Sequence, residues 1–101
     1  MKALVKYLSS LQDKIFKLLP MRESFDFGEQ NHVREYADHL AANCKGALNV
    51  YPELSDEPGY LDVVNNIIFM VTEWPDYEKW RSMVFRSTRI VHELHDKYSI
   101  D

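Results

Sequence analysis

The sequence predicts an all-α fold, an antiparallel four-helix bundle with short loops. Apolar residues recur at helical spacing in four segments, and two of these segments carry heptad seams. The three glycines and four prolines are too few for the many tight turns of an all-β fold. A length of 101 residues suits one domain with a modest core, so we expect residues 1–101 to form a single helical-bundle domain.

Segment 60–74 has the widest apolar face and is the predicted central helix. Its apolar side chains fill an arc of about 180° on a helical wheel, which is more than one neighbouring helix can cover. A strand over residues 67–71 is the alternative, because β-branched residues are dense there, but the length of the run favours a helix. The inward-facing residues are Tyr60, Leu61, Val63, Val64, Ile67, Ile68, Met70, Val71 and Trp74, and the polar side carries Asp62, Asn65, Asn66, Thr72 and Glu73.

The first helix is predicted over residues 2–19, with Pro20 ending it. Its lysines lie off the apolar seam, so the helix could lie on a membrane surface. A bundle helix with a solvated lysine face is the favoured interpretation. The seam consists of Leu4, Leu8, Leu11, Ile15 and Leu18, widened by Val5, Phe16 and Leu19.

The second helix is predicted over residues 31–50, with Asn31 as its N-cap. Residues 21–30 before it show no sustained period and contain a glycine, so we interpret them as a connection. We expect Phe25 and Phe27 to pack this connection onto the bundle, because two aromatic rings in water would be costly. The inner face of the helix consists of Val33, Tyr36, Ala37, Leu40, Cys44, Ala47, Leu48 and Tyr51.

Proline and acidic residues mark the other boundaries. In the loop before the central helix, Ser55 or Asp56 is the expected cap, with Pro58 near the first helical position. Asp76 is the expected N-cap of a fourth helix over residues 77–98. The heptad seam of this helix consists of Tyr77, Trp80, Val84, Ser87, Val91, Leu94 and Tyr98.

Composition argues against several classes of protein. No stretch approaches the ~18 uninterrupted apolar residues of a membrane span, and the amino terminus has no signal-peptide pattern. The single cysteine, Cys44, lies on an apolar stripe, which indicates a buried structural thiol. We therefore expect a cytoplasmic protein. The net charge of −4 argues against extensive wrapping of nucleic acid, though not against a local basic site, so we do not expect nucleic acid as the partner.

The charges are unevenly distributed along the chain. Residues 46–78 contain no Lys or Arg and carry a charge of −7, so the rest of the chain carries +3. These charges could be paired or solvated within the bundle. Alternatively, they form an acidic surface that attracts a basic protein partner. The acids are Glu53, Asp56, Glu57, Asp62, Glu73, Asp76 and Glu78.

Two phenylalanines lie on polar helix faces. Phe69 lies among acidic and amide residues of the central helix, an arrangement typical of the anchor of a protein interface. Phe85 lies among arginines of the fourth helix, where it could also stack on single-stranded RNA. A single exposed aromatic residue is common, however, and the connection 21–30 could cover one of them.

The four histidines form two pairs. His32 and His39 are two helical turns apart, about 10 Å along the axis, which is too far for the two to bind one metal ion alone. Glu29 and His32 match the Glu-x-x-His spacing of bundle metal sites once, without a second copy. His92 and His95 lie near the end of the fourth helix, where a protonated imidazole interacts favourably with the helix dipole. We therefore predict no metal and no cofactor.

A loose catalytic spacing occurs twice, at Arg34–His39 and at Arg86–His92. This Arg-x(4–6)-His spacing resembles that of HEPN-type RNases, which are helical bundles, and the resemblance covers only these residues. It implies a histidine that acts as general acid and base and an arginine that stabilises phosphate charge. The second pair is the better match, because Ser87 follows its arginine. The sequence contains no phosphate-binding glycine-rich loop, Cys-x-x-Cys or nucleophile elbow.

The sequence favours a small non-catalytic interaction protein, such as an inhibitor, an immunity-type protein or a regulatory subunit. We expect an acidic surface with an aromatic anchor to bind a basic protein partner. The alternative is a metal-independent RNase that uses Arg86 and His92. A homodimer through the seam of residues 2–19 is a further possibility. The expected partner-binding residues are Glu53, Asp56, Glu57, Asp62, Asn66, Phe69 and Glu73.

Overall fold

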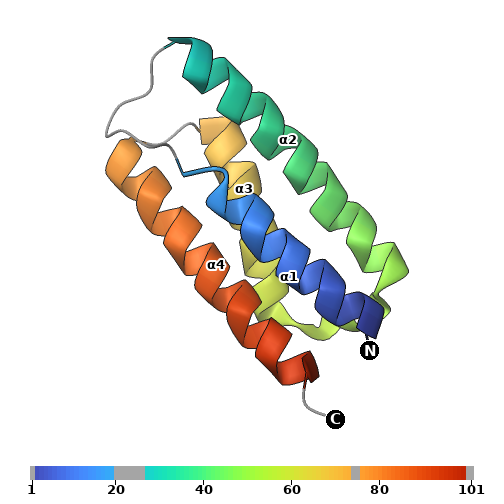
Figure 1. Cartoon of the computed structure of the whole chain (residues 1–101). Helices are drawn as coiled ribbons and strands as arrows, with labels where there is room; N and C mark the ends of the chain where they lie inside the picture. Colours follow the sequence, from blue (N-terminus) through green and yellow to red (C-terminus); the bar gives the residue numbers. More distant parts are fainter. Residues whose placement is uncertain (1, 20–26, 74–75, 100–101) are drawn as a thin grey trace.

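The computed structural model describes residues 2–19, 27–73 and 76–99, with the backbone alone for residue 2 and residues 27–31. This part of the chain forms an all-α helical bundle, as the apolar spacing predicted. Residues 67–71 are helical, so the strand alternative was wrong. The elements are α1 (Lys2–Phe16), α2 (Phe27–Val50), a 3₁₀-helix η1 (Pro52–Asp56), α3 (Pro58–Glu73) and α4 (Tyr77–Ser99) (Figure 1).

The helices lie lengthwise beside one another. The packing is most extensive between α1 and α4, whereas α3 packs on both α2 and α4. Contacts between α3 and α4 run in opposite order along the chain. Asn66 of α3 meets Ser87 of α4, whereas Phe69, later in α3, meets Lys79 near the start of α4. This order is the one that an antiparallel pair produces; the antiparallel arrangement of the whole bundle stays a prediction.

The two predicted heptad seams form much of the core. All five seam residues of the first helical segment are at most 1% exposed. In α4, the central five seam residues are buried and Tyr77 and Tyr98 at its ends are half-buried. Because the first seam is already covered within the chain, a homodimer would need a different surface. The buried seam residues are Leu4, Leu8, Leu11, Ile15 and Leu18, together with Trp80, Val84, Ser87, Val91 and Leu94.

The buried face of α3 is narrower than the predicted arc. Leu61, at the edge of that arc, is 37% exposed, and Ile68 and Val71 are half-buried. The neighbouring helices cover the middle of the apolar face and leave its edge in solvent. Trp74 lies outside the described residues. The buried residues of α3 are Tyr60, Val63, Val64, Ile67 and Met70.

The hydroxyl of Tyr60 connects three helices. It donates to the carbonyl oxygen of Cys44 in α2 over 2.6 Å, so its oxygen accepts the hydrogen of the Tyr7 hydroxyl of α1 over 2.8 Å. The ring of Tyr7 stacks on that of Tyr51, with centroids 5.3 Å apart. Burial raises the pKa of Tyr7, of Tyr60 and of the Cys44 thiol, so all three stay neutral. The prediction that Cys44 is a buried thiol is confirmed.

Regular α1 ends earlier than predicted, and α2 begins earlier than predicted. Regular α1 ends at Phe16, after which the Leu18 and Leu19 N–H groups donate to the carbonyls three residues earlier. Helix α2 begins at Phe27, so Asn31 lies inside it and is not its N-cap. Glycine destabilises a helix mainly at interior positions, and the glycine at position 28 falls in the first turn of α2. Pro20, Phe25 and the side chain of Phe27 lie outside the described residues.

The boundaries around α3 were partly predicted. The loop before it contains η1, in which the Ser55 hydroxyl donates to the carbonyl of Pro52 over 2.7 Å. Glu57 directly precedes α3, so neither Ser55 nor Asp56 is its cap, while Pro58 does occupy its first position. The prediction for Asp76 is confirmed, because its Oδ1 accepts the N–H of Lys79 over 2.9 Å at the start of α4.

Candidate partner-binding surface

Four of the predicted site residues share one side of α3, which we call the α3 acidic face (Asp62, Asn66, Phe69 and Glu73). Their spacing of three and four residues puts them above one another on the helix. Asp62 and Glu73 are exposed, whereas Asn66 and Phe69 are half-buried. The two carboxylates make no ion pair with any residue that the structure describes.

The ring of Phe69 is in contact with a cation of the same chain. The ammonium nitrogen of Lys79, at the start of α4, lies 4.9 Å from the centroid of this ring. A lysine over an aromatic face is held by the negative potential of the ring. The ring of Phe69 is therefore half-buried, and one of its faces is in contact with a basic side chain of the same chain.

Asn66 contacts the neighbouring helix. Its amide nitrogen lies 3.4 Å from the hydroxyl of Ser87, to which it donates, and Ser87 is 1% exposed. A bond of this length is weak. Asn66 therefore contributes to the junction of α3 with α4 as well as to the acidic face.

Glu57, one of the predicted partner-binding residues, is paired within the chain. It is 9% exposed, and its Oε1 accepts hydrogen bonds from the Lys97 ammonium over 2.6 Å and the Tyr98 hydroxyl over 2.7 Å. The hydrogen bond from Lys97 is the largest cause that lowers the pKa of Glu57. The hydrogen bond to this carboxylate raises the pKa of Tyr98 to about 12. Both partners of Glu57 are distant in the sequence, 40 and 41 residues away.

The other two acids of the loop lie close to the end of α4. Asp56 is exposed and Glu53 is half-buried. Their charges contribute to the raised pKa of Tyr98, after the larger effect of Glu57. The predicted site is thus divided into the α3 acidic face and a second acidic group beside the carboxyl-terminal turns of α4.

The residues of the RNase alternative do not converge. Arg86 and His92 are both exposed on α4. Six residues of α-helix separate them by about 9 Å along the axis and about 120° around it, so their side chains leave the helix in different directions. Arg34 and His39 are likewise exposed on α2.

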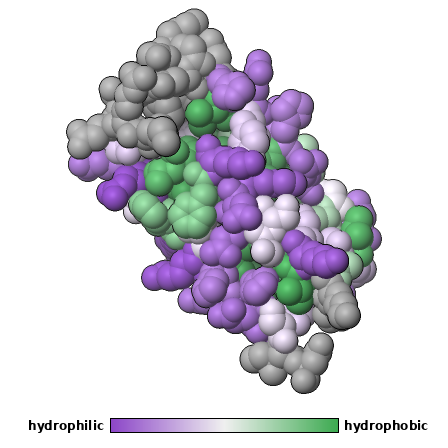
Figure 2. All heavy atoms as spheres, in the orientation of Figure 1, coloured by the Kyte–Doolittle hydropathy of each residue, from purple (hydrophilic) through white to green (hydrophobic). Residues whose placement is uncertain are grey.

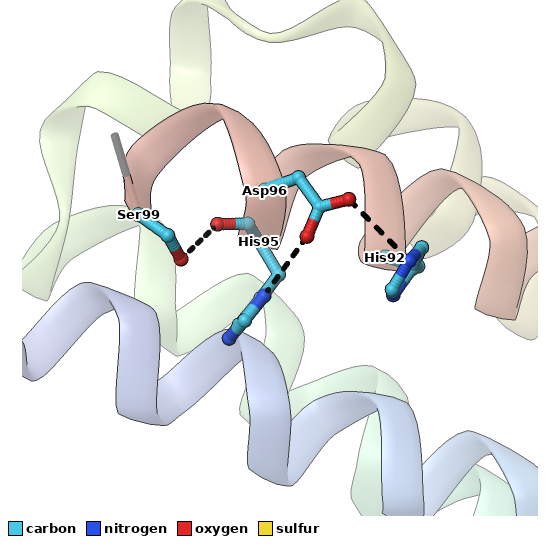
Figure 3. A network of polar contacts seen from close by, with 4 residues as sticks. All are labelled: His92, His95, Asp96 and Ser99. Atoms are coloured by element: carbon cyan, nitrogen blue, oxygen red, sulfur yellow. Dashed lines mark hydrogen bonds and ion pairs between the residues drawn. The ribbon is translucent and has the colours of Figure 1, made fainter.

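His92 and His95 share a carboxylate that we did not predict. Asp96 places one oxygen 3.4 Å from Nε2 of His92 and the other 3.5 Å from Nδ1 of His95 (Figure 3). The hydroxyl of Ser99 donates to the carbonyl of His95 over 2.6 Å and extends the network to the end of α4. The i, i+4 spacing of His92 and Asp96 was the available sequence signal.

The other histidines form no metal centre in the described part of the chain. His32 and His39 are exposed, and the side chain of Glu29 lies outside the described residues. Within residues 2–19, 27–73 and 76–99, no three His, Cys, Asp or Glu side chains are placed to hold a metal ion. Among the same residues, no helix has the length and apolar character that crossing a bilayer requires.

Two exposed aromatic residues that meet at the surface, Phe16 and Phe85, were not predicted. We call these two residues, together with the neighbouring Arg81, the aromatic patch. The rings of Phe16 and Phe85 are 45% and 42% exposed and meet edge to face, with centroids 6.4 Å apart. The guanidinium carbon of Arg81 lies 5.1 Å from the centroid of Phe85. Phe16 therefore does not widen the buried seam of α1 as predicted. Figure 2 shows apolar side chains at the surface where the end of α1 adjoins the start of α4.

Comparisons of the chain with protein-family models, with curated proteins and with solved structures gave no match.

Proposed function

We propose that this protein is a small non-catalytic binding protein whose α3 acidic face recognises a basic segment of a protein partner. One observation carries the proposal: the ring of Phe69 lies between the exposed acids of α3 and holds the ammonium of Lys79 over its face. A lysine or arginine of the partner could replace Lys79 there and interact with the carboxylates of Asp62 and Glu73. Inhibitors, immunity-type proteins and regulatory subunits all act by binding of this kind.

The acidic residues and the aromatic ring would contribute differently. An exposed ion pair contributes only about 0–1 kcal/mol, so Asp62 and Glu73 would mainly accelerate the encounter with a basic partner and make it sensitive to salt. Binding free energy would have to come from contacts that become buried around Phe69. Glu57 is excluded from the site because its carboxylate is already used within the chain.

We also propose a cytoplasmic location. Cys44 is a buried thiol with no second cysteine to pair with, which suits a reducing compartment.

The first experiment compares capture of proteins from the native host by three forms of the chain. The test form carries Asp62→Asn with Glu73→Gln. The matched control carries Asp13→Asn with Glu93→Gln, which removes the same charge from exposed positions on α1 and α4. We expect a partner that is retained by the wild type and the control and lost by the test form. Equal retention by all three forms would refute the role of the α3 acidic face.

A second experiment measures the affinity of the purified partner for two variants, each of which removes one side of the contact between Phe69 and Lys79. Phe69→Ala removes the ring and should weaken association while lowering Tm by only a few degrees, because the ring is half-buried. Lys79→Ala removes the lysine that competes for the ring and should strengthen association several-fold. A larger fall of Tm for Phe69→Ala would mark the ring as core, and weaker binding by Lys79→Ala would contradict the competition. Calorimetric titration measures both affinities.

A further inference from the structure

The aromatic patch lies between two helices that pack closely below it. Phe16 comes from the end of α1 and Phe85 from the third turn of α4, and the two rings are in contact at the surface. The remaining exposure of each ring is above 40%, so the pair presents continuous apolar surface to solvent. Paired exposed aromatic rings of this kind mark an interaction site more strongly than scattered single residues do.

A hollow adjoins the patch and carries charges of both signs. It has a volume of about 800 Å³ and is lined by the first turns of α4, including Asp76, Glu78, Arg81 and Phe85. All three charged residues are exposed. A strongly basic partner would meet Arg81, and a strongly acidic partner would meet Asp76 and Glu78. The lining is therefore complementary to a surface that carries the same mixture.

We propose that the aromatic patch and this hollow form the interface with a second copy of the chain. In a twofold dimer the same surface meets itself, so it must be complementary to itself. Aromatic rings would then meet aromatic rings, and Arg81 of each copy would face Asp76 or Glu78 of the other. The proposal is independent of the partner-binding function.

The rest of the fold is compatible with this dimer. The apolar seam of α1 is buried inside the chain, so association through the aromatic patch requires no unfolding. Arg81 and Lys79 are two residues apart on α4 and project to different sides of it. The α3 acidic face, which Lys79 adjoins, therefore stays accessible in both copies, and the dimer would present two partner-binding faces.

The dimer should be weak. The patch is small compared with the ~800 Å² that each partner usually contributes to a stable interface. We therefore expect a dissociation constant of about 10 µM to 1 mM, which sedimentation equilibrium can measure over this concentration range. The weight-average mass should rise from 12.0 kDa towards twice that value. A mass that stays at 12.0 kDa at every concentration up to about 1 mM, the upper end of the expected range of dissociation constants, would overturn the proposal.

Two sets of variants locate the interface. Phe85→Ala and Phe16→Ala should each weaken association at least about tenfold, the scale expected for a central aromatic contact. Val50→Ala, at an apolar position of α2 that is 67% exposed, should leave it unchanged. Because all three side chains are exposed, dichroism should show an intact fold in each case. Equal effects of Val50→Ala and Phe85→Ala, or no effect of Phe85→Ala, would overturn the proposal.

A charge exchange then tests the pairing between copies. Arg81→Glu places like charges opposite each other and should abolish association. Combining it with Glu78→Arg restores opposite charges across the interface and should recover part of the affinity. If the double variant associates no better than Arg81→Glu alone, the proposed pairing of Arg81 with Glu78 is wrong.

Discussion

The indole N–H of Trp80 donates to the carbonyl oxygen of Leu18 over 2.8 Å, and both residues are fully buried. Leu18 lies just beyond regular α1, where the last carbonyls of a helix have no intrahelical N–H partner. A side chain that is 62 residues away in the sequence therefore satisfies the end of α1 and fixes it against α4.

Trp80→Phe should destabilise the protein by about 2–4 kcal/mol. The change keeps an aromatic ring but removes the donor and part of the volume, so it leaves the Leu18 carbonyl without this bond and creates a cavity. Urea unfolding measures the loss. The exposed ring of Phe85 provides the control, because Phe85→Leu should cost less than about 1 kcal/mol. Similar losses for the two variants would contradict a special role for the indole.

The carboxylate of Glu57 should give stability a defined dependence on pH. Its pKa is lowered in the folded protein, first by the hydrogen bond from Lys97, so it stabilises the fold above the ordinary value of 4.5. This contribution is lost as the pH falls through the lowered, folded-state pKa. The pKa of Tyr98 is raised from 10.0 to about 12, so its contribution is complete below pH 10 and is lost as the pH rises towards 12.

Glu57→Gln tests both limbs of this pH dependence. The variant should be less stable than the wild type at pH 7, and the difference should shrink at strongly acidic pH and between pH 10 and 12, the two values that bound the shift of Tyr98. Urea unfolding across the pH range gives the two curves. Parallel curves for wild type and variant would show that Glu57 does not control these titrations.

Two glycines should respond in opposite directions to replacement by alanine. Gly46 is exposed within α2 and a Cβ there meets no atom within 4 Å, so Gly46→Ala should stabilise the protein by about 0.5–1 kcal/mol. At Gly59 a Cβ would lie 2.9 Å from Cγ2 of Ile90, because α3 closely approaches α4 there. Gly59→Ala should therefore destabilise the protein, and thermal unfolding of the two variants compares them. Stabilisation by Gly59→Ala would mean that Ile90 moves aside easily.

We expect no RNA cleavage that depends on Arg86 and His92. The two side chains leave α4 about 120° apart, which does not bring both to one phosphate. Single-stranded RNA incubated with the wild type, with Arg86→Ala and with His92→Ala should show the same background rate. Cleavage by the wild type that disappears in His92→Ala would instead establish the RNase alternative.

Local patterns in the sequence were sufficient for much of the fold. The heptad seam of residues 4–18 and that of α4 were recognised because apolar periodicity is a property of neighbouring turns. The cap at Asp76 was predicted because it depends on a residue only three positions away. The start of α2 was missed, since the glycine at position 28 was interpreted as a helix breaker although it falls in the first turn.

The site was predicted less well because its decisive contacts are long-range. The chemistry of Glu57 depends on Lys97 and Tyr98, and nothing near Glu57 in the sequence announces them. The meeting of Phe16 with Phe85 likewise depends on how α1 and α4 align. The common side of Asp62, Phe69 and Glu73 was predictable because helical geometry alone determines it.

The extensive packing of α1 on α4 has a consequence for synthesis of the chain. The two helices are separated by 60 residues, so α1 leaves the ribosome roughly 3 to 12 s before α4 can follow, at a typical rate of elongation. During that interval the leucines of α1 lack the helix on which α1 packs most extensively. A nascent chain arrested before Tyr77 should therefore be a preferred client of chaperones, and this preference should end once the last helix has emerged.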